Sequence, residues 1–278
     1  MHAAITICLV PEARQGPFVC HGLADDADYG LEAGCRMAAE LGFAAVEIFP
    51  ESAETFPRAA LRRLLAAAGL GLAAVGTGAG WLKHKLHLCH ADPAVRERAR
   101  EFIGAIVDVA GECGAPAIIG SMQGRSEGEV SREAALEHLA AALQGLGERA
   151  ARHGQVLLYE PLNRYETNLF NRQADAAGFL DRCDSPSVQL LCDLFHMNIE
   201  EPDMAGALRA CGSRVGHVHW ADSNRLAMGL GHTDPGPVVA ALKAIGYQGC
   251  LSAEVFPLPS AFVAAHKSAQ SVQSATAT

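Results

Sequence analysis

Short apolar runs alternate with longer amphipathic stretches along the whole chain, and this alternation constrains the fold more than any other feature. Eight runs rich in aliphatic residues predict strands, and each of the first seven is followed by a stretch with helical periodicity. The predicted strands lie at 5–10, 44–49, 70–78, 115–120, 156–160, 188–193, 214–220 and 250–256. Strands that alternate with helices pair in parallel. Eight such units in 278 residues predict an α/β fold, a single-domain (β/α)8 TIM barrel.

An open, doubly wound sheet is the alternative arrangement of such units. Sheets of that kind carry a glycine-rich nucleotide-binding turn after the first strand, and "VPEARQGPF" at 10–18 has none. No repeat of solenoid period and no linker divides the chain, so we expect one catalytic barrel domain over 1–265. The remaining residues, 266–278, are small and polar and predict a flexible tail.

Composition excludes several classes of partner. The net charge is −9 and no run of Lys or Arg occurs, which argues against a nucleic-acid surface. No apolar run is long enough to cross a bilayer, so we expect no membrane partner. Nine cysteines occur without a C-x-x-C spacing, mostly in apolar surroundings, and we interpret them as buried free thiols. Such thiols predict a reducing compartment, the cytoplasm.

Polar residues stand at the carboxyl ends of four successive predicted strands. Glu160 ends the fifth strand and Asp193 the sixth, the seventh carries His217 and His219 on one face, and the eighth ends near Glu254. Barrel active sites lie at the carboxyl ends of the strands. Two Glu, one Asp and one His suit Mn²⁺, Co²⁺ or Mg²⁺ better than a structural zinc site. Crowded carboxylates repel one another without a cation, so the pattern predicts one divalent metal ion.

The loops after these strands carry further polar residues that can reach back over the metal. Glu166, His196 and Arg225 follow the predicted ligands and can hold a polyhydroxylated substrate, or they can form ordinary ion pairs within the loops. Glu47 closes the second predicted strand. It can form an ion pair at the barrel rim, or it can contact the substrate or a metal ligand. Trp81 covers the substrate or packs in the core.

Five motifs carry a resemblance to a known family. "YEPLNRYETN", "CDLFHMNIEE", "HVHWADSNR", "GHTD" and "LSAEVF" resemble the ketose 3-epimerases of the xylose-isomerase-like barrels, such as the D-tagatose and D-allulose 3-epimerases. "AVGTGAGWLKHKLHLCHADPAVRERA" and "AIIGSMQGRSEGE" resemble the branch that epimerises keto-hexonates such as 5-keto-L-gluconate. The resemblance covers most of the chain and is more specific in its second half.

The resemblance implies a metal-dependent isomerase that inverts the carbon next to a ketone, through an enediolate, in a ketose or keto-hexonate. It implies one divalent ion, Mn²⁺ above all, with no organic cofactor, and a homo-oligomer, dimer or tetramer. The implied metal ligands are Glu160, Asp193, His219 and Glu254; Glu160 and Glu254 are also the catalytic acid/base pair; and Glu166, His196 and Arg225 bind the substrate.

Other reactions use the same barrel and the same proton-transferring groups. The sequence does not distinguish the epimerase from an aldose–ketose or hydroxypyruvate-type isomerase or from an inosose dehydratase. A metal-dependent apurinic-site endonuclease should show more His and Asp ligands and a basic groove. The net negative charge of the chain disfavours such a groove. A subunit of a heteromeric glycoside-processing complex is the most distant alternative.

Overall fold

Parallel strands close into a barrel in the computed structural model, which describes residues 1–21, 30–183 and 185–277. The sheet has nine strands in the order β2-β1-β3-β4-β5-β6-β7-β8-β9, and a further pairing of β1 with β9 closes it. All eight predicted strands form, which confirms the predicted (β/α)8 barrel. They are β1 His2–Cys8, β3 Ala45–Phe49, β4 Gly71–Gly76, β5 Ala117–Ile119, β6 Leu157–Tyr159, β7 Val188–Asp193, β8 Val215–His219 and β9 Cys250–Ala253.

The additional strand, β2 Cys20–His21, was not predicted from the sequence. It pairs with Ile7 and Cys8 of β1, beyond Ile5, the last residue of β1 that pairs with β9. β2 therefore continues the barrel wall where β9 has ended. Two residues are too few to show a strand period.

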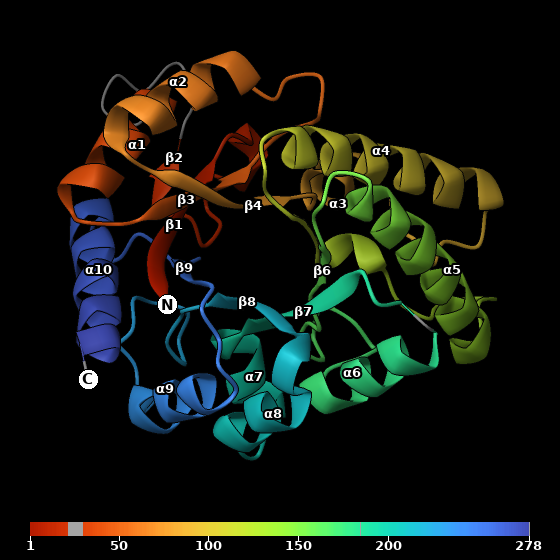
Figure 1. Cartoon of the computed structure of the whole chain (residues 1–278). Coiled ribbons are helices and arrows are strands. Elements are labelled where there is room, and N and C mark those ends of the chain that lie inside the picture. Colours follow the sequence, from red (N-terminus) through yellow and green to blue (C-terminus); the bar gives the residue numbers. More distant parts are fainter. Residues whose placement is uncertain (22–29, 184, 278) are drawn as a thin grey trace.

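Helices surround the barrel on its outside (Figure 1). Several begin at side chains that accept a hydrogen bond from the first turn, as Asp92, Ser131, Asp203 and Asp234 do. The α-helices are α1 Leu31–Glu40, α2 Arg58–Ala68, α3 Ala79–His84, α4 Pro93–Glu112, α5 Arg132–Ala151, α6 Gln173–Arg182, α7 Leu194–Glu200, α8 Met204–Cys211, α9 Pro235–Ala244 and α10 Ala261–Ala277; the 3-10 turns are η1 Pro11–Ala13, η2 Ser121–Gln123 and η3 Gly212–Arg214.

The barrel interior changes from apolar to polar along the strands. A buried cluster of Ala74, Ile118, Leu158 and Leu191 fills one level of four neighbouring strands. Successive side chains of a strand point to opposite faces, so the residue two positions later returns to the same face. On β6 and β7 those residues are Glu160 and Asp193. The strand period thus places both carboxylates inside the barrel, at the carboxyl ends of the strands.

The segment expected to be a flexible tail, 266–278, is instead helical as far as Ala277, while Thr278 lies outside the described residues. Within α10, buried Ala264, Ala265, Ser268 and Val272 form one face at helical spacing. This face packs against β1, β9 and α9. The expectation was wrong because the face is built from small residues, which contribute little to the apolar periodicity of the sequence. No helix in the described ranges is both long and apolar enough to cross a membrane.

Candidate metal and active site

Three buried donor atoms converge at the mouth of the barrel. The Nδ1 atom of His219 lies 3.5 Å from Oδ2 of Asp193 and 3.8 Å from Oε1 of Glu160. These three residues offer ligand atoms that all lie within 4.8 Å of one another. Each of the three atoms is buried and has no hydrogen-bond partner among the described residues. Because unpaired buried polar atoms are costly, and this set of O and N donors suits a divalent cation, the site fits a metal ion.

Glu254 brings a fourth donor from the residue after β9. Its Oε2 atom lies 3.7 Å from Nδ1 of His219 and accepts a hydrogen bond of 2.5 Å from Nη2 of Arg225. Arg225 Nη2 also lies 3.7 Å from Oδ2 of Asp193. The four predicted ligands are therefore neighbours, and one of them is held by a guanidinium.

The electrostatics of the cluster favour a bound cation. Burial raises the pKa of Glu160 well above its usual value, and the charges of Glu254 and Asp193 add to the effect. Burial disfavours the charged form of His219, yet Glu47 and Glu254 together hold its pKa well above the usual range. A site with three carboxylates at such short range draws either protons or a divalent ion.

His196 presents a neutral hydrogen-bond donor to this cluster. Asp193 ends β7 and caps α7 by accepting a hydrogen bond from the backbone N–H of Phe195, which sets His196 in the first turn of α7. Nδ1 of His196 lies 2.7 Å from Nδ2 of Asn163 and accepts a further hydrogen bond of 3.3 Å from the backbone N–H of Asn163. Its hydrogen therefore sits on Nε2, which lies 3.7 Å from both Glu160 and Asp193. Burial lowers the pKa of His196 to about 4, so the ring is uncharged at neutral pH.

Asp222 organises the loop that carries Arg225. The carboxylate is fully buried. It accepts hydrogen bonds from four backbone N–H groups of its own loop, those of Ser223, Gly229, Gly231 and Thr233. A carboxylate with this many donors fixes the path of the loop after β8.

Arg225 is held at a defined position by that loop and by Phe195. Its backbone is left-handed, with φ of 59°, and its N–H donates to the carbonyl of Asp222. The guanidinium lies over the ring of Phe195, 4.9 Å from its centre. The side chain is thus directed over the carboxylate cluster.

Glu166 stands at the rim of the same site. Its side chain is 41 % exposed, and its Oε1 lies 3.8 Å from Nδ1 of His196 and 4.0 Å from Nη1 of Arg225. Asn163 donates a hydrogen bond to the same oxygen. The structure therefore brings all seven sequence-predicted site residues together, while their individual roles remain predictions.

A cavity of about 440 Å³ opens next to the donor atoms, a volume suited to a small ligand. Six of the seven predicted residues line it, and Asp193 lies beneath its floor, fully buried. The wall away from the donor atoms is largely apolar and includes Phe18, Phe49, Trp81 and Leu82.

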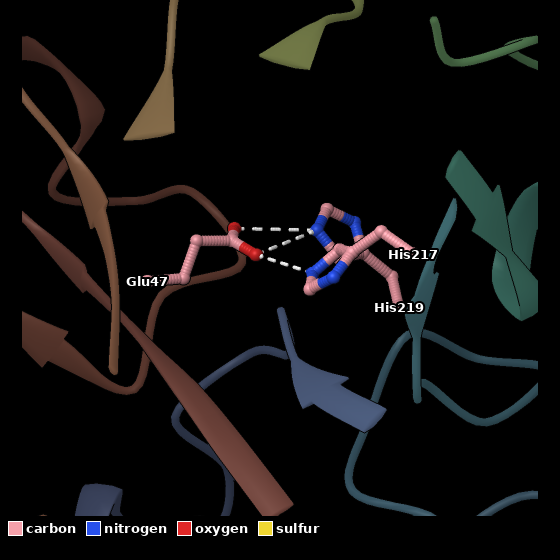
Figure 2. Close-up of side chains that lie close together, drawn as sticks. All are labelled: Glu47, His217 and His219. Atoms are coloured by element: carbon pink, nitrogen blue, oxygen red, sulfur yellow. Dashed lines mark hydrogen bonds and ion pairs between the residues drawn. The ribbon is translucent and has the colours of Figure 1, made fainter. Parts of the chain in front are cut away.

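Two residues of the site were missed by the sequence interpretation, and a third, Glu47, was left between two alternatives. Glu47 lies inside the barrel, 2 % exposed, and contacts His217 and His219, so it contacts a predicted metal ligand and is not a rim ion pair (Figure 2). Asn163 and Asp222 lie within the quoted motifs but were assigned no role. A buried acid in the apolar run "AAVEIF" was the available signal for Glu47.

Comparison with known proteins shows the family to which this fold is similar. The model of the xylose isomerase-like TIM barrel family matches residues 35–272. A ketose 3-epimerase of Arthrobacter globiformis is 30 % identical over 242 residues, which cover 85 % of this chain and 82 % of that protein. An L-ribulose 3-epimerase of Methylomonas sp. is 37 % identical over 168 residues, which cover 59 % of this chain and 58 % of that protein. The crystal structure of a D-allulose 3-epimerase from Methylomonas sp. in complex with D-allulose superposes with a TM-score of 0.83 at 26 % identity, covering 99 % of this chain and 96 % of that chain.

Proposed function

This chain belongs to the xylose isomerase-like TIM barrel family, in which its relatives include ketose 3-epimerases, and we propose that it inverts the carbon next to the ketone of a ketose. The observation that carries the proposal is the set of three buried, unpartnered donor atoms beside a cavity of small-ligand size. A pair of glutamates, Glu160 and Glu254, flanks the same histidine nitrogen at 3.8 and 3.7 Å.

In this proposal Glu160, Asp193, His219 and Glu254 hold one divalent cation, with Mn²⁺ as the preferred ion and Co²⁺ or Mg²⁺ as alternatives. Three carboxylate ligands and one imidazole are a largely hard donor set, which supports these ions over a structural zinc. When bound, the cation supplies the positive charge that makes a hydrogen next to the ketone acidic enough to remove.

The two glutamates perform the proton transfer. One carboxylate removes the proton from one face of the carbon, and the electron pair of the broken C–H bond moves onto the ketone oxygen to give an enediolate. The other glutamate, as the acid, returns a proton to the opposite face, and the electron pair returns to re-form the ketone. Glu160 follows β6 and Glu254 follows β9, with β7 and β8 between them in the barrel wall, which supports attack from two sides.

The remaining polar residues position the substrate. Nε2–H of His196 and the guanidinium of Arg225 donate to substrate oxygens near the ketone, where negative charge develops. Glu166, exposed at the rim, accepts from a hydroxyl group farther from the reacting carbon. Asn163 holds Glu166 and His196 in place, and Phe195 and Asp222 hold Arg225. Catalysis requires such fixed positions.

We propose a ketose without a phosphate or carboxylate group as the substrate. Among the described residues that line the cavity, Arg225 is the one Lys or Arg side chain, and it already contacts Glu254. The far wall offers aromatic side chains, and the carboxylate of Glu12 on it is already paired with Lys83 at 3.2 Å. A sugar hydroxyl chain with C–H groups against Phe49 and Trp81 suits such a wall.

A cytoplasmic location and a homo-oligomeric state, dimer or tetramer, complete the proposal. The burial of Cys8, Cys20, Cys35, Cys89, Cys192 and Cys211 supports a reducing compartment.

Deuterium incorporation distinguishes the proposed reaction from the alternatives. D-Allulose and its C3 epimer D-fructose are incubated in D₂O with the Mn²⁺-loaded protein, and NMR locates the deuterium. Epimerisation places deuterium on C3 of both sugars. Deuterium on C1 with appearance of an aldose would identify an isomerase instead, and faster turnover of a keto-hexonate than of any ketose would contradict the assignment of substrate.

A further inference from the structure

Glu47 lies inside the barrel at a point where two histidines of β8 meet it (Figure 2). Its Oε2 atom lies 2.8 Å from Nε2 of His217, and its two oxygens lie 3.2 and 3.3 Å from Nε2 of His219. The side chain belongs to β3, which β1 and β9 separate from β8 in the barrel wall. The contact therefore spans the barrel interior between strands that are not neighbours.

The contact determines which nitrogen of His219 faces the cluster. In the neutral form that binds a metal, an imidazole that donates its Nε2–H to a carboxylate keeps Nδ1 without a hydrogen. Nδ1 of His219 is the atom that lies between Asp193, Glu160 and Glu254. Only the nitrogen without a hydrogen can bind a metal ion, so Glu47 holds the ring in the competent tautomer and orientation.

His217 and Thr6 complete the surroundings of Glu47. The hydroxyl group of Thr6 donates a 3.1 Å hydrogen bond to Oε1, so three side chains donate to one buried carboxylate. Both oxygens of Glu47 are paired, whereas Oε1 of Glu160 and Oδ2 of Asp193 are not. The donors of Glu47, His217 and His219 are close enough together to suggest a second cation, but their mutual hydrogen bonds account for them without one.

We propose that Glu47 is a positioning residue that presents Nδ1 of His219 to the metal, and that His217 holds Glu47 for this purpose. The inference rests on the metal site of the proposed function. Carboxylates in this relation to a metal-binding histidine typically contribute 10- to 100-fold in metal affinity, and we expect a loss of about that size when Glu47 is replaced.

The variant Glu47→Gln tests the inference without changing the volume of the side chain. The amide keeps one accepting oxygen with two lone pairs, whereas Thr6, His217 and His219 are three donors, so at least one of them loses its acceptor. The amide also carries no negative charge. The Kd for Mn²⁺ is measured by isothermal titration on the chelator-treated full-length protein, and ¹⁵N spectra of labelled histidines report the tautomer of His219. We expect Mn²⁺ to bind about 10- to 100-fold more weakly, with loss of the single Nε2–H tautomer of His219.

Asp108→Asn is the matched control, because Asp108 is also a carboxylate that pairs with a histidine. It lies on α4, outside the barrel, and its Oδ1 is 3.0 Å from Nε2 of His153. This variant should bind Mn²⁺ as the wild type does.

Four outcomes separate the inference from the proposed function. Tight Mn²⁺ binding by both wild type and Glu47→Gln overturns the inference alone. A stoichiometry of two ions, with one lost in His217→Gln, also overturns it, because Glu47 would then be a ligand. Weakened binding in Glu47→Gln together with wild-type protein that epimerises no ketose upholds the inference and overturns the function. No Mn²⁺ binding by the wild type overturns both.

Discussion

Replacing either glutamate of the pair by glutamine should stop inversion but leave half of the reaction intact. In Glu160→Gln the remaining carboxylate, Glu254, still exchanges the proton of the one epimer whose C–H bond faces it. In Glu254→Gln the carboxylate of Glu160 does the same for the other epimer. Each variant should therefore introduce deuterium into one sugar of a C3-epimeric pair without converting it to the other.

The size of the effect follows from the role of each group. Loss of a positioned acid or base lowers the rate by about 100- to 10,000-fold, or about 2.7 to 5.4 kcal/mol in the activation free energy. Each glutamate also lies within 4 Å of Nδ1 of His219, at 3.8 Å for Glu160 and 3.7 Å for Glu254, so the variants bind metal more weakly and must be assayed at saturating Mn²⁺. The metal-free Glu160→Gln variant should unfold at no lower temperature than the wild type, because the amide replaces a carboxyl group whose charged form is disfavoured by burial and by neighbouring carboxylates.

The assay incubates each variant with D-allulose and separately with D-fructose in D₂O and follows C3 by NMR. The Asp108→Asn variant serves as the control for a carboxylate outside the site. Exchange into both sugars by one variant, or inversion at the wild-type rate by either, would refute the assignment of one carboxylate to each face.

Three further predictions follow from the same geometry. Dialysis against a chelator should remove activity, and Mn²⁺ or Co²⁺ should restore it. At a concentration of about 100 times its Kd, the ion should add about 2.7 kcal/mol to the free energy of unfolding, which raises the melting temperature. Arg225→Lys should lower kcat/KM by about 10- to 100-fold while the fold is kept, because an ammonium group keeps the charge but not the planar fork of donors. Asp222→Asn should destabilise the protein by about 2 kcal/mol, measured by denaturant unfolding. Burial alone would raise the pKa of Asp222, but hydrogen bonds from four backbone N–H groups outweigh burial and lower that pKa from 3.8 to about 2. Since this pKa lies below the unfolded value, the stabilisation is present above about pH 4 and is lost as the pH falls towards 2, so the variant and the wild type should converge in stability there.

The ligand cluster was predictable because it depends on two local rules. Strand period places every second residue inside the barrel, and parallel strands end at one rim, so Glu160, Asp193 and His219 could be placed together from the sequence alone. His196 and Arg225 followed because they come shortly after strand ends.

The parts that were missed or left open depend on contacts between distant segments. Glu47 was named with two alternatives, but its partner His219 lies 172 positions later, and no local pattern shows which strand faces which across a barrel. The role of Asp222 depends on the folded path of a loop. The helical end of the chain was missed because the buried face of α10 consists of small side chains such as Ala264 and Ser268.

A crystal of the Mn²⁺-loaded protein, measured at the manganese absorption edge, tests the central claim most directly. We predict one anomalous peak per chain, bounded by Nδ1 of His219 and by carboxylate oxygens of Glu160, Asp193 and Glu254. A map without a peak at that position, or with the ion bound to other residues, would contradict the metal-dependent mechanism.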